Sequence, residues 1–530
     1  MDVSTVLSFV LFTFLVALVS WWKTRKKNTE TTTGLFFASR KNNFWVVGGA
    51  LFLSNISANQ FIGENESIYI NNMSVIAWGV SSVAAMLLVA EFFLPVYFRT
   101  GAMTIPDFLG KRYDASTKRL VSLVFLVSYI VNLLPAVLYG GAVAFTGMFD
   151  FLDFLNLTYW QNIWIVVWVI GLIGTLYSIL GGLRAITISD SVLSIGLLII
   201  GVAFPYFGFR YLGNDSWTEG LQLVLTTHKE HLDSIGGAGD EIPFGTIFTG
   251  MFIINLYYWG MEQYIVQQAM TAKNLSHSQK GMALACVGKL LCPFLINIPG
   301  IIGVHLYDNL SYTAAVFPLV VKDTLPAVMT GLTAAVVLGA AITTFNAGLN
   351  SSSTLFILNL YKPWMKLRNR KVTESMLVRN GKRFEIAISL LAMCCAPFIM
   401  FVNTGFYTYL QQLTGMFCVP VFTIIFIGFV TRKVPPGAAK TGLVFFIVAY
   451  LICNFILDIP LHYLHLLGIL FVLTSVCMLL SVRWFPEHHY RETIRKDVDI
   501  SPWKYRHWAA ITLLLGMVLV FAFFSAAGIA

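Results

Sequence analysis

The chain has 530 residues, of which 57% are hydrophobic and only 12% are charged. Soluble globular domains carry about 25% charged residues, and so small a polar share cannot cover this many apolar side chains. Together with a mean hydropathy of +0.74, these values exclude a water-soluble protein and predict a polytopic membrane protein. The formal net charge of +9 could indicate an acidic partner. Its interpretation depends on where the cations lie relative to the membrane.

Apolar stretches long enough to cross a bilayer, about 20 residues each, recur along the whole chain. The first has neither a basic start nor a small-residue cleavage pattern, so we interpret it as a retained helix and not as a signal peptide. We therefore expect an all-α protein with one membrane domain over residues 1–530. The fourteen expected spans are residues 4–22, 44–67, 73–98, 119–147, 162–180, 186–209, 244–269, 281–307, 312–321 running with 326–360, 384–402, 406–431, 440–457, 462–482 and 508–528.

The lysine and arginine residues are distributed unevenly between the expected loops. If the loop after the first span is cytoplasmic, 31 of the 35 lie in cytoplasmic loops. The positive-inside rule then predicts that both termini lie outside, and it explains the net charge without a nucleic-acid partner. Arg210, Lys229 and Lys322 lie on the other side, and Lys289 lies within the eighth span.

Two polar clusters lie at mid-depth of expected spans. The segment 54–60 (SNISANQ) has five polar residues in seven, and the segment 255–263 (NLYYWGMEQ) is similar. Small polar side chains also hold membrane helices together. Five of them in one and a half turns surround the helix axis, however, so we expect the helix to be unwound there.

These two spans are five helices apart, which predicts two inverted repeats of five helices with a solute site at the bilayer midplane. The first repeat covers residues 44–209 and the second covers residues 244–431. One extra helix, residues 4–22, precedes them, and three extra helices follow in residues 440–528.

Three further features inside the spans indicate chemistry. Thr343 and Thr344 lie in a hydroxyl-rich segment whose hard oxygens suit an alkali cation, although some hydroxyls there are expected to bond to their own helix. Lys289 lies roughly 12 Å into its span, where it either lines a cavity or extends to the membrane edge. Asp190 lies nearer an edge, where it is either functional or merely solvated.

The sequence contains no nucleotide-binding loop, nucleophile elbow or metal-binding spacing. We therefore expect neither an enzyme nor an ATP-driven pump. The seven cysteines lie in or beside apolar stretches and are interpreted as small hydrophobic residues.

Several motifs follow one another along nearly the whole chain: NISANQFIG, FLPVYF with TIPDFLGKRY, YSILGGLRAITISDSV, NLYYWGMEQYIVQQ, GLNSSSTLF and YLQQLTG. In their order and spacing the sequence resembles the sodium:solute symporter family, in its sodium/glucose and sodium/galactose cotransporter branch. The resemblance implies a leucine-transporter-type fold in the plasma membrane. It also implies sodium-coupled symport of a monosaccharide or related polar solute into the cell by alternating access.

The resemblance further implies particular site residues. The coupling ion, Na⁺, would bind the backbone carbonyl groups of Leu53, Ile56 and Ala340 and the hydroxyl groups of Thr343 and Thr344, with Asp190 beside the sodium path. The sugar-like substrate would contact Gln60, Ser82, Asn255, Tyr258, Lys289 and Gln411. The gates would include Tyr258, Tyr407 and Glu64.

The sequence departs from the family pattern at Gly79, where sugar-transporting relatives usually have a glutamate. Losing such a charge-assisted acceptor removes about 1.5–3 kcal/mol of binding. Asn59 also replaces a common acid. The substrate is therefore left open between a hexose, a polyol and a sugar derivative, and a non-transporting sensor or channel-like protein is a further alternative.

Overall fold

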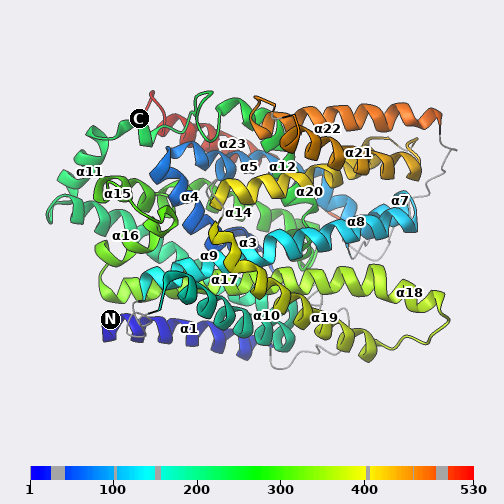
Figure 1. Cartoon of the computed structure of the whole chain (residues 1–530), viewed down its shortest axis with the longest axis horizontal. Coiled ribbons are helices and arrows are strands. Elements are labelled where there is room, and N and C mark those ends of the chain that lie inside the picture. The colour runs from blue at the N-terminus through cyan, green and yellow to red at the C-terminus, as the bar shows by residue number, and fades with distance from the viewer. Residues whose placement is uncertain are drawn as a thin grey trace.

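The molecule is a bundle of long helices whose axes lie mostly along the long axis of the molecule (Figure 1). The computed structural model describes residues 2–24, 42–100, 104–149, 157–401, 406–431, 433–457, 459–484 and 499–530. Within these ranges the structure is helical, and extended pairing is limited to one isolated bridge between Asn42 and Ala272. The expected all-α class is confirmed.

The helices keep the order that the apolar stretches predict. They are α1 (Val3–Thr24), α3 (Phe44–Asn55), α4 (Ala58–Ile70), α5 (Ala77–Leu88), α6 (Leu94–Thr100), α7 (Ile105–Arg112), α8 (Ala115–Ser128), α9 (Leu134–Met148), α10 (Tyr159–Leu212), α11 (Trp217–Thr226), α12 (Gly250–Met261), α13 (Gln263–Ala269), α14 (Leu275–Leu295), α15 (Ile298–Leu306), α16 (Val316–Thr324), α17 (Ala327–Leu355), α18 (Lys362–Leu367), α19 (Glu374–Cys395), α20 (Phe406–Val430), α21 (Pro436–Phe455), α22 (Tyr463–Leu480) and α23 (Arg506–Phe523).

Twelve helical segments in the described ranges are long and apolar enough to cross a membrane, judged by length and composition. The spans built from α3 with α4 and from α12 with α13 are not among them, because each is divided into two short helices. Adding these two interrupted spans to the twelve gives the fourteen that the sequence predicts. Helix α10 covers the fifth and sixth spans, which lie at Tyr159–Gly181 and Ala185–Leu212.

The backbone breaks at both predicted polar clusters. In the first, α3 ends at Asn55, and the next two residues, Ile56 (φ −85°, ψ 82°) and Ser57 (φ −88°, ψ 172°), are not helical. In the second, Glu262 (φ −63°, ψ 120°) separates α12 from α13, and its side chain accepts a hydrogen bond from the backbone N–H of Gln263. Such breaks leave peptide groups without their helical partners, so they create polar surface inside the bundle.

The prediction of the ninth span was wrong in one respect. We expected residues 312–321 to run on into residues 326–360, but α16 is a separate short helix that ends at Thr324, and α17 begins at Ala327. Pro326 lies between the two helices. Proline has no N–H group and restricts the residue before it to extended conformations, and Leu325 is accordingly extended (φ −91°, ψ 145°).

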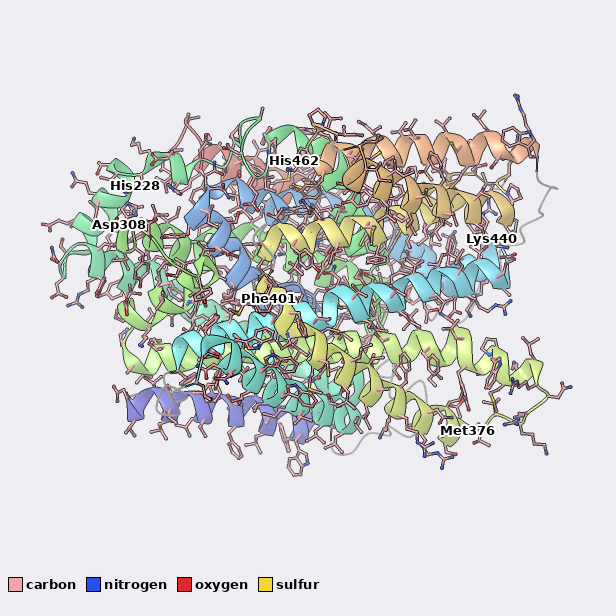
Figure 2. The ribbon with its side chains drawn as sticks, in the orientation of Figure 1. His228, Asp308, Met376, Phe401, Lys440 and His462 are labelled. Atoms are coloured by element: carbon pink, nitrogen blue, oxygen red, sulfur yellow. The ribbon has the colours of Figure 1, made fainter. Side chains whose placement is uncertain are left out.

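Both termini lie at the same end of the bundle (Figure 1). His228 and Asp308 lie at this end, whereas Met376 and Lys440 lie at the opposite end (Figure 2). Met376 lies in the first turn of α19, next to the segment between α18 and α19, which contains Arg368, Arg370 and Lys371. The ends of the bundle thus differ in charge as the loop analysis requires, and the outside position of the termini stays a prediction. Several of the counted cations, among them residues 25–27, lie outside the described residues.

Helix α3 packs closely against α14 through glycine residues. A Cβ atom at Gly48 would lie 2.7 Å from Leu284 Cδ2 and 3.0 Å from the carbonyl oxygen of Gly281. A Cβ atom at Gly281 would in turn lie 2.8 Å from Val47 Cγ1. Small residues permit this kind of close backbone approach between membrane helices. The contact fixes α3, and therefore the first helix break, against the second half of the chain.

We predict that Gly48→Leu lowers the melting temperature in detergent, because overpacking typically destabilises by about 1–3 kcal/mol. The measurement is thermal unfolding of the purified protein followed by size-exclusion chromatography. Gly239→Leu is the control, since nothing lies within 4 Å of a Cβ atom built at Gly239. Equal melting temperatures for both variants would show that α3 and α14 are not in close contact.

Candidate functional site

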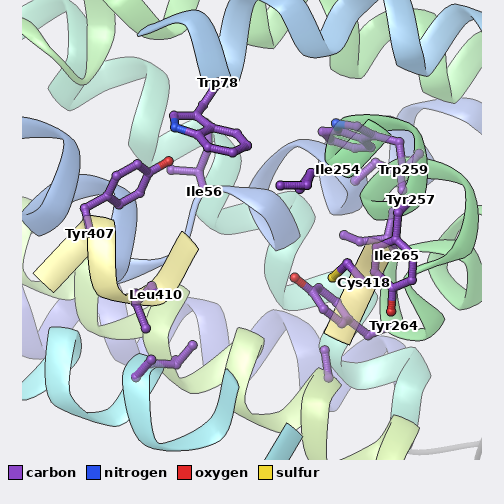
Figure 3. Packing of buried hydrophobic residues seen from close by; sticks show 14 of the residues in the cluster. Ile56, Trp78, Ile254, Tyr257, Trp259, Tyr264, Ile265, Tyr407, Leu410 and Cys418 are labelled. Carbon is purple, nitrogen blue, oxygen red and sulfur yellow. The ribbon is translucent and has the colours of Figure 1, made fainter. Parts of the chain in front are cut away.

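A central cavity of about 140 Å³ lies at the two helix breaks, a volume that suits one small solute. It is lined by all six residues predicted to contact a substrate: Gln60, Ser82, Asn255, Tyr258, Lys289 and Gln411. Figure 3 shows Trp78, Trp259 and Tyr407 in this region, and all three line the cavity. The other lining residues are Ser54, Asn55, Ser57, Asn59, Asn132, Leu133, Ala136, Ile254, Tyr264, Thr344, Leu410 and Thr414.

Several polar atoms in the cavity wall lack partners. Asn59 Oδ1, Gln60 Oε1 and Trp78 Nε1 are buried and make no hydrogen bond to the described part of the chain. Leaving a buried polar group unpaired costs about 1–3 kcal/mol. The wall therefore offers hydrogen-bond acceptors and a donor to a polar solute, with aromatic faces beside them.

Other polar groups of the wall are held in position by neighbours. The Ser82 hydroxyl group donates to the Gly79 carbonyl oxygen at 2.6 Å. The Asn255 side-chain amide donates to Ser81 Oγ at 3.2 Å. These bonds orient the two side chains before any solute arrives, which lowers the entropy lost on binding.

Asp190 of α10 joins the two interrupted spans. Its Oδ2 atom accepts hydrogen bonds from Ser54 of α3 at 2.9 Å and from Gln268 of α13 at 3.2 Å. Gln268 is held in turn by Thr187, whose hydroxyl group donates to its Oε1 atom at 2.7 Å. The sequence left open whether Asp190 is solvated near a membrane edge, and the structure places it fully buried.

Of the predicted sodium ligands, Thr343 lies next to this carboxylate. The Thr343 hydroxyl group of α17 is a hydrogen-bonding neighbour of Asp190 and also lies 3.3 Å from the Ala340 carbonyl oxygen. Thr344 Oγ1 is buried and has no hydrogen-bond partner among the described residues. Leu53 lies in the last turn of α3, and Ile56 lies in the break itself. Of these five residues, only Thr344 also lines the cavity.

Glu64, predicted as a gate residue, lies behind the cavity wall and not on it. Its carboxylate accepts from Gln60 Nε2 and from Asn297 Nδ2, both at 2.9 Å, and from the Tyr407 hydroxyl group at 3.4 Å. These partners belong to α4, to the junction of α14 with α15, and to α20. Glu64 therefore holds three elements together beside the site.

Two tyrosine contacts border the cavity. Tyr407 packs on α4, since a Cβ atom at Gly63 would lie 2.8 Å from its Cδ2 atom. Tyr258 forms a hydrogen bond of 2.6 Å with the hydroxyl group of Tyr264, across the break between α12 and α13. Both predicted tyrosine gates thus contact the interrupted spans directly.

Sequence reasoning missed Glu241, which lies in the segment before α12. Its carboxylate accepts hydrogen bonds from Ser67 and Asn71 at the end of α4 and from Thr408 of α20. Its backbone carbonyl group accepts one from His462 Nε2 at 2.9 Å. Glu241 therefore ties α4 to α20 next to Tyr407. The segment 212–243 contains several acidic residues, and nothing in its pattern distinguishes this one.

Comparisons with known proteins identify the family and the fold. The model of the sodium:solute symporter family matches residues 35–444. The uncharacterized symporter YidK of Escherichia coli (strain K12) is 38% identical over 520 residues, which is 98% of this chain and 90% of the relative. The sodium/glucose cotransporter of Vibrio parahaemolyticus is 26% identical over 463 residues, 83% of each chain.

A solved structure of a Na⁺-coupled sialic acid symporter, in a substrate-bound outward-open state, has the same fold. It matches with a TM-score of 0.75 at 15% identity and covers 92% of this chain and 100% of that one. The expected leucine-transporter-type fold is confirmed.

We predict that Glu241→Ala opens the cavity on the side of Tyr407. The change removes the hydrogen bonds that the carboxylate accepts from α4 and α20, each contributing about 1 kcal/mol to the contact between these helices. The measurement is the rate at which a membrane-impermeant maleimide alkylates Leu410→Cys, a cavity position, and we expect a faster rate in the Glu241→Ala background. Glu230→Ala is the control, because it removes the same charge from an exposed residue. If both backgrounds react equally, Glu241 does not hold the cavity closed.

Proposed function

The chain belongs to the sodium:solute symporter family, and we propose that it couples the inward movement of sodium to the uptake of a monosaccharide or a related small polar solute. As a member of this family it is a multi-pass membrane transporter and not an enzyme. The observation that carries the proposal is the cavity between the two interrupted spans, whose wall combines unpaired amide oxygens with aromatic side chains.

In the proposed solute site, each side chain has a role that its chemistry supports. Gln60, Ser82, Asn255 and Gln411 exchange hydrogen bonds with hydroxyl groups of the solute. Tyr258 stacks on the apolar face of the ring and forms the inner gate. Lys289 donates from its ammonium group. Their convergence on one cavity supports this assignment, since six positions from five different helices meet there.

In the proposed sodium site, the ion binds the carbonyl oxygens of Leu53, Ile56 and Ala340 and the hydroxyl oxygens of Thr343 and Thr344. All five ligands are hard oxygen atoms, which suit an alkali cation. The unpaired Thr344 hydroxyl oxygen supports the assignment, because an ion would provide the partner that the protein does not. Asp190 lies beside this set and would attract the cation along its path.

Coupling would arise from the position of the first helix break. Ile56 lies in the proposed sodium site, and Gln60, one turn further on, lies in the proposed solute site. An ion that orders the break also orders the solute contacts, so each ligand increases the affinity for the other. Inward movement of a single charge gains about 2.3 kcal/mol per 100 mV of membrane potential, which would drive accumulation of the solute across the plasma membrane.

The proposal is tested by uptake into proteoliposomes that contain the purified protein. With a sodium gradient directed inward, we expect accumulation of a labelled monosaccharide above its external concentration, and loss of this accumulation when potassium replaces sodium. Accumulation that is equal in the two salts would contradict symport. Sodium-dependent binding without accumulation would instead identify a sensor or a channel-like protein.

We predict that Thr344→Ala raises the half-saturating sodium concentration about tenfold or more. The substitution removes the contact between the Thr344 hydroxyl oxygen and the ion, and a polar contact to a charge contributes about 1.5–3 kcal/mol of binding free energy. The measurement is a sodium titration of uptake. Thr333→Ala is the matched control, because Thr333 is buried on the same helix but its hydroxyl group already donates to the Met329 carbonyl oxygen at 2.8 Å. Identical titrations for both variants would remove Thr344 from the sodium site.

A further inference from the structure

We infer that the solute carries a negative charge and that its anionic group binds the Lys289 ammonium group, on the side of the cavity where Gly79 leaves the charge without a partner. The inference rests on the proposed function, because it specifies the substrate class for the same cavity. It distinguishes a sugar acid or a sugar sulfate, whose oxyanions share one chemistry, from a neutral sugar or polyol.

The first step is the state of Lys289 itself. Its side chain lies on α14, is only 2% exposed and lines the cavity. No hydrogen bond or ion pair to any described residue engages its Nζ atom. An ammonium group that is buried without a partner is strongly unfavourable, whereas a lysine on a cavity wall can be paired by the ligand that enters.

The second step is that the neighbouring carboxylates are engaged elsewhere. Glu64 attracts Lys289 through space, but its oxygens accept hydrogen bonds from Gln60, Asn297 and Tyr407. Asp190 is bonded to Ser54 and Gln268 as described above. Glu262 accepts from Tyr129 and from the backbone of Gln263.

None of these three acids lines the cavity. Among the described lining residues, Lys289 is the only one with a formal charge. Lys289 therefore gives the cavity wall its formal positive charge, with Glu64 attracting it from behind the wall, and an oxyanion of the solute is electrostatically complementary to that charge.

The third step is the space at Gly79 on α5. A Cβ atom built there would meet only Lys289, at 3.9 Å from Cδ and 4.0 Å from Nζ. These are ordinary van der Waals distances, so a side chain could begin at this position directly beside the ammonium group. Glycine supplies no side-chain acceptor to the ammonium group at this position. A charge-assisted hydrogen bond from Lys289 to an oxyanion of the solute would take that role.

The rest of the wall indicates what the anion is attached to. Gln60 Oε1 and Asn59 Oδ1 are unpaired acceptors, and they suit the hydroxyl groups of the solute. Trp78 and Tyr258 provide aromatic faces, which pack against the apolar side of a ring. These features are those expected around a hydroxylated ring that bears one acidic group.

The test compares two variants of equal size, Gly79→Glu and Gly79→Gln. The probes are D-glucuronate and glucose 6-sulfate as anions, and D-glucose and myo-inositol as neutral solutes. Binding is measured in sodium chloride as the rise in melting temperature of the purified full-length protein over a range of probe concentrations. We expect the anions to stabilise the unmodified protein at lower concentrations than the neutral solutes do.

In Gly79→Glu the new carboxylate pairs with Lys289, so we expect apparent anion affinity to fall about tenfold or more. Gly79→Gln has the same size without the charge and is expected to retain anion binding within about threefold, which is less than one charged contact. Lys289→Arg and Lys289→Gln form a second pair, in which only the arginine variant should retain preference for the anions. If Lys289→Gln does not fold, the comparison of Gly79→Glu with Gly79→Gln still tests whether the solute carries a negative charge.

The inference is overturned if the neutral solutes stabilise the protein as well as the anions do, or if Gly79→Glu leaves anion binding unchanged. Either result would mean that Glu64 compensates Lys289 from behind the wall. Anion binding that is equal in sodium and potassium would contradict the proposed coupling but support the charge of the solute. If no probe of either class binds, both the sugar-like substrate and its charge are overturned.

Discussion

The two broken helices impose the constraint on which the rest of the structure depends. Within a bilayer every backbone polar group needs a partner, so a non-helical segment at this depth is tolerated only where it is buried in protein or lines a wet cavity. Here the breaks at Ile56 and Glu262 adjoin one cavity and are held by hydrogen bonds from other helices. Asp190 does this for both spans through Ser54 and Gln268. Its carboxylate is therefore a structural link whatever its part in ion movement.

The features that were predictable from the sequence are those for which the membrane imposes a recognisable residue pattern. Apolar length reveals the spans, and a polar segment such as 54–60 inside a span reveals a break, because its burial would otherwise be too unfavourable. The family resemblance then places six residues on one cavity. The error at α16 and α17 has a different cause, since both segments are apolar and only Pro326 separates them.

Contacts between loops and distant helices could not be predicted in the same way. Glu241 is one acidic residue among several in an exposed segment, and its importance depends on where Ser67, Asn71 and Thr408 lie in space. Glu64 is a related case, because its position behind the wall and not on it follows from Asn297, more than two hundred residues away in the chain. Periodicity reports which face of a helix is buried, but it does not report which partner covers that face.

The charge balance of the core connects these observations. Each of the buried acids Asp190, Glu64 and Glu262 accepts at least one hydrogen bond from a distant helix or junction, so each one links two or more elements. Lys289 differs from these acids because it lines the cavity and makes no hydrogen bond or ion pair to another described helix. In a core where polar groups otherwise hold helices together, a charge that is left for a ligand makes binding sensitive to the ligand's own charge. Because the same cavity wall contains Thr344, the proposed sodium ion and the proposed charged solute would lie at one site.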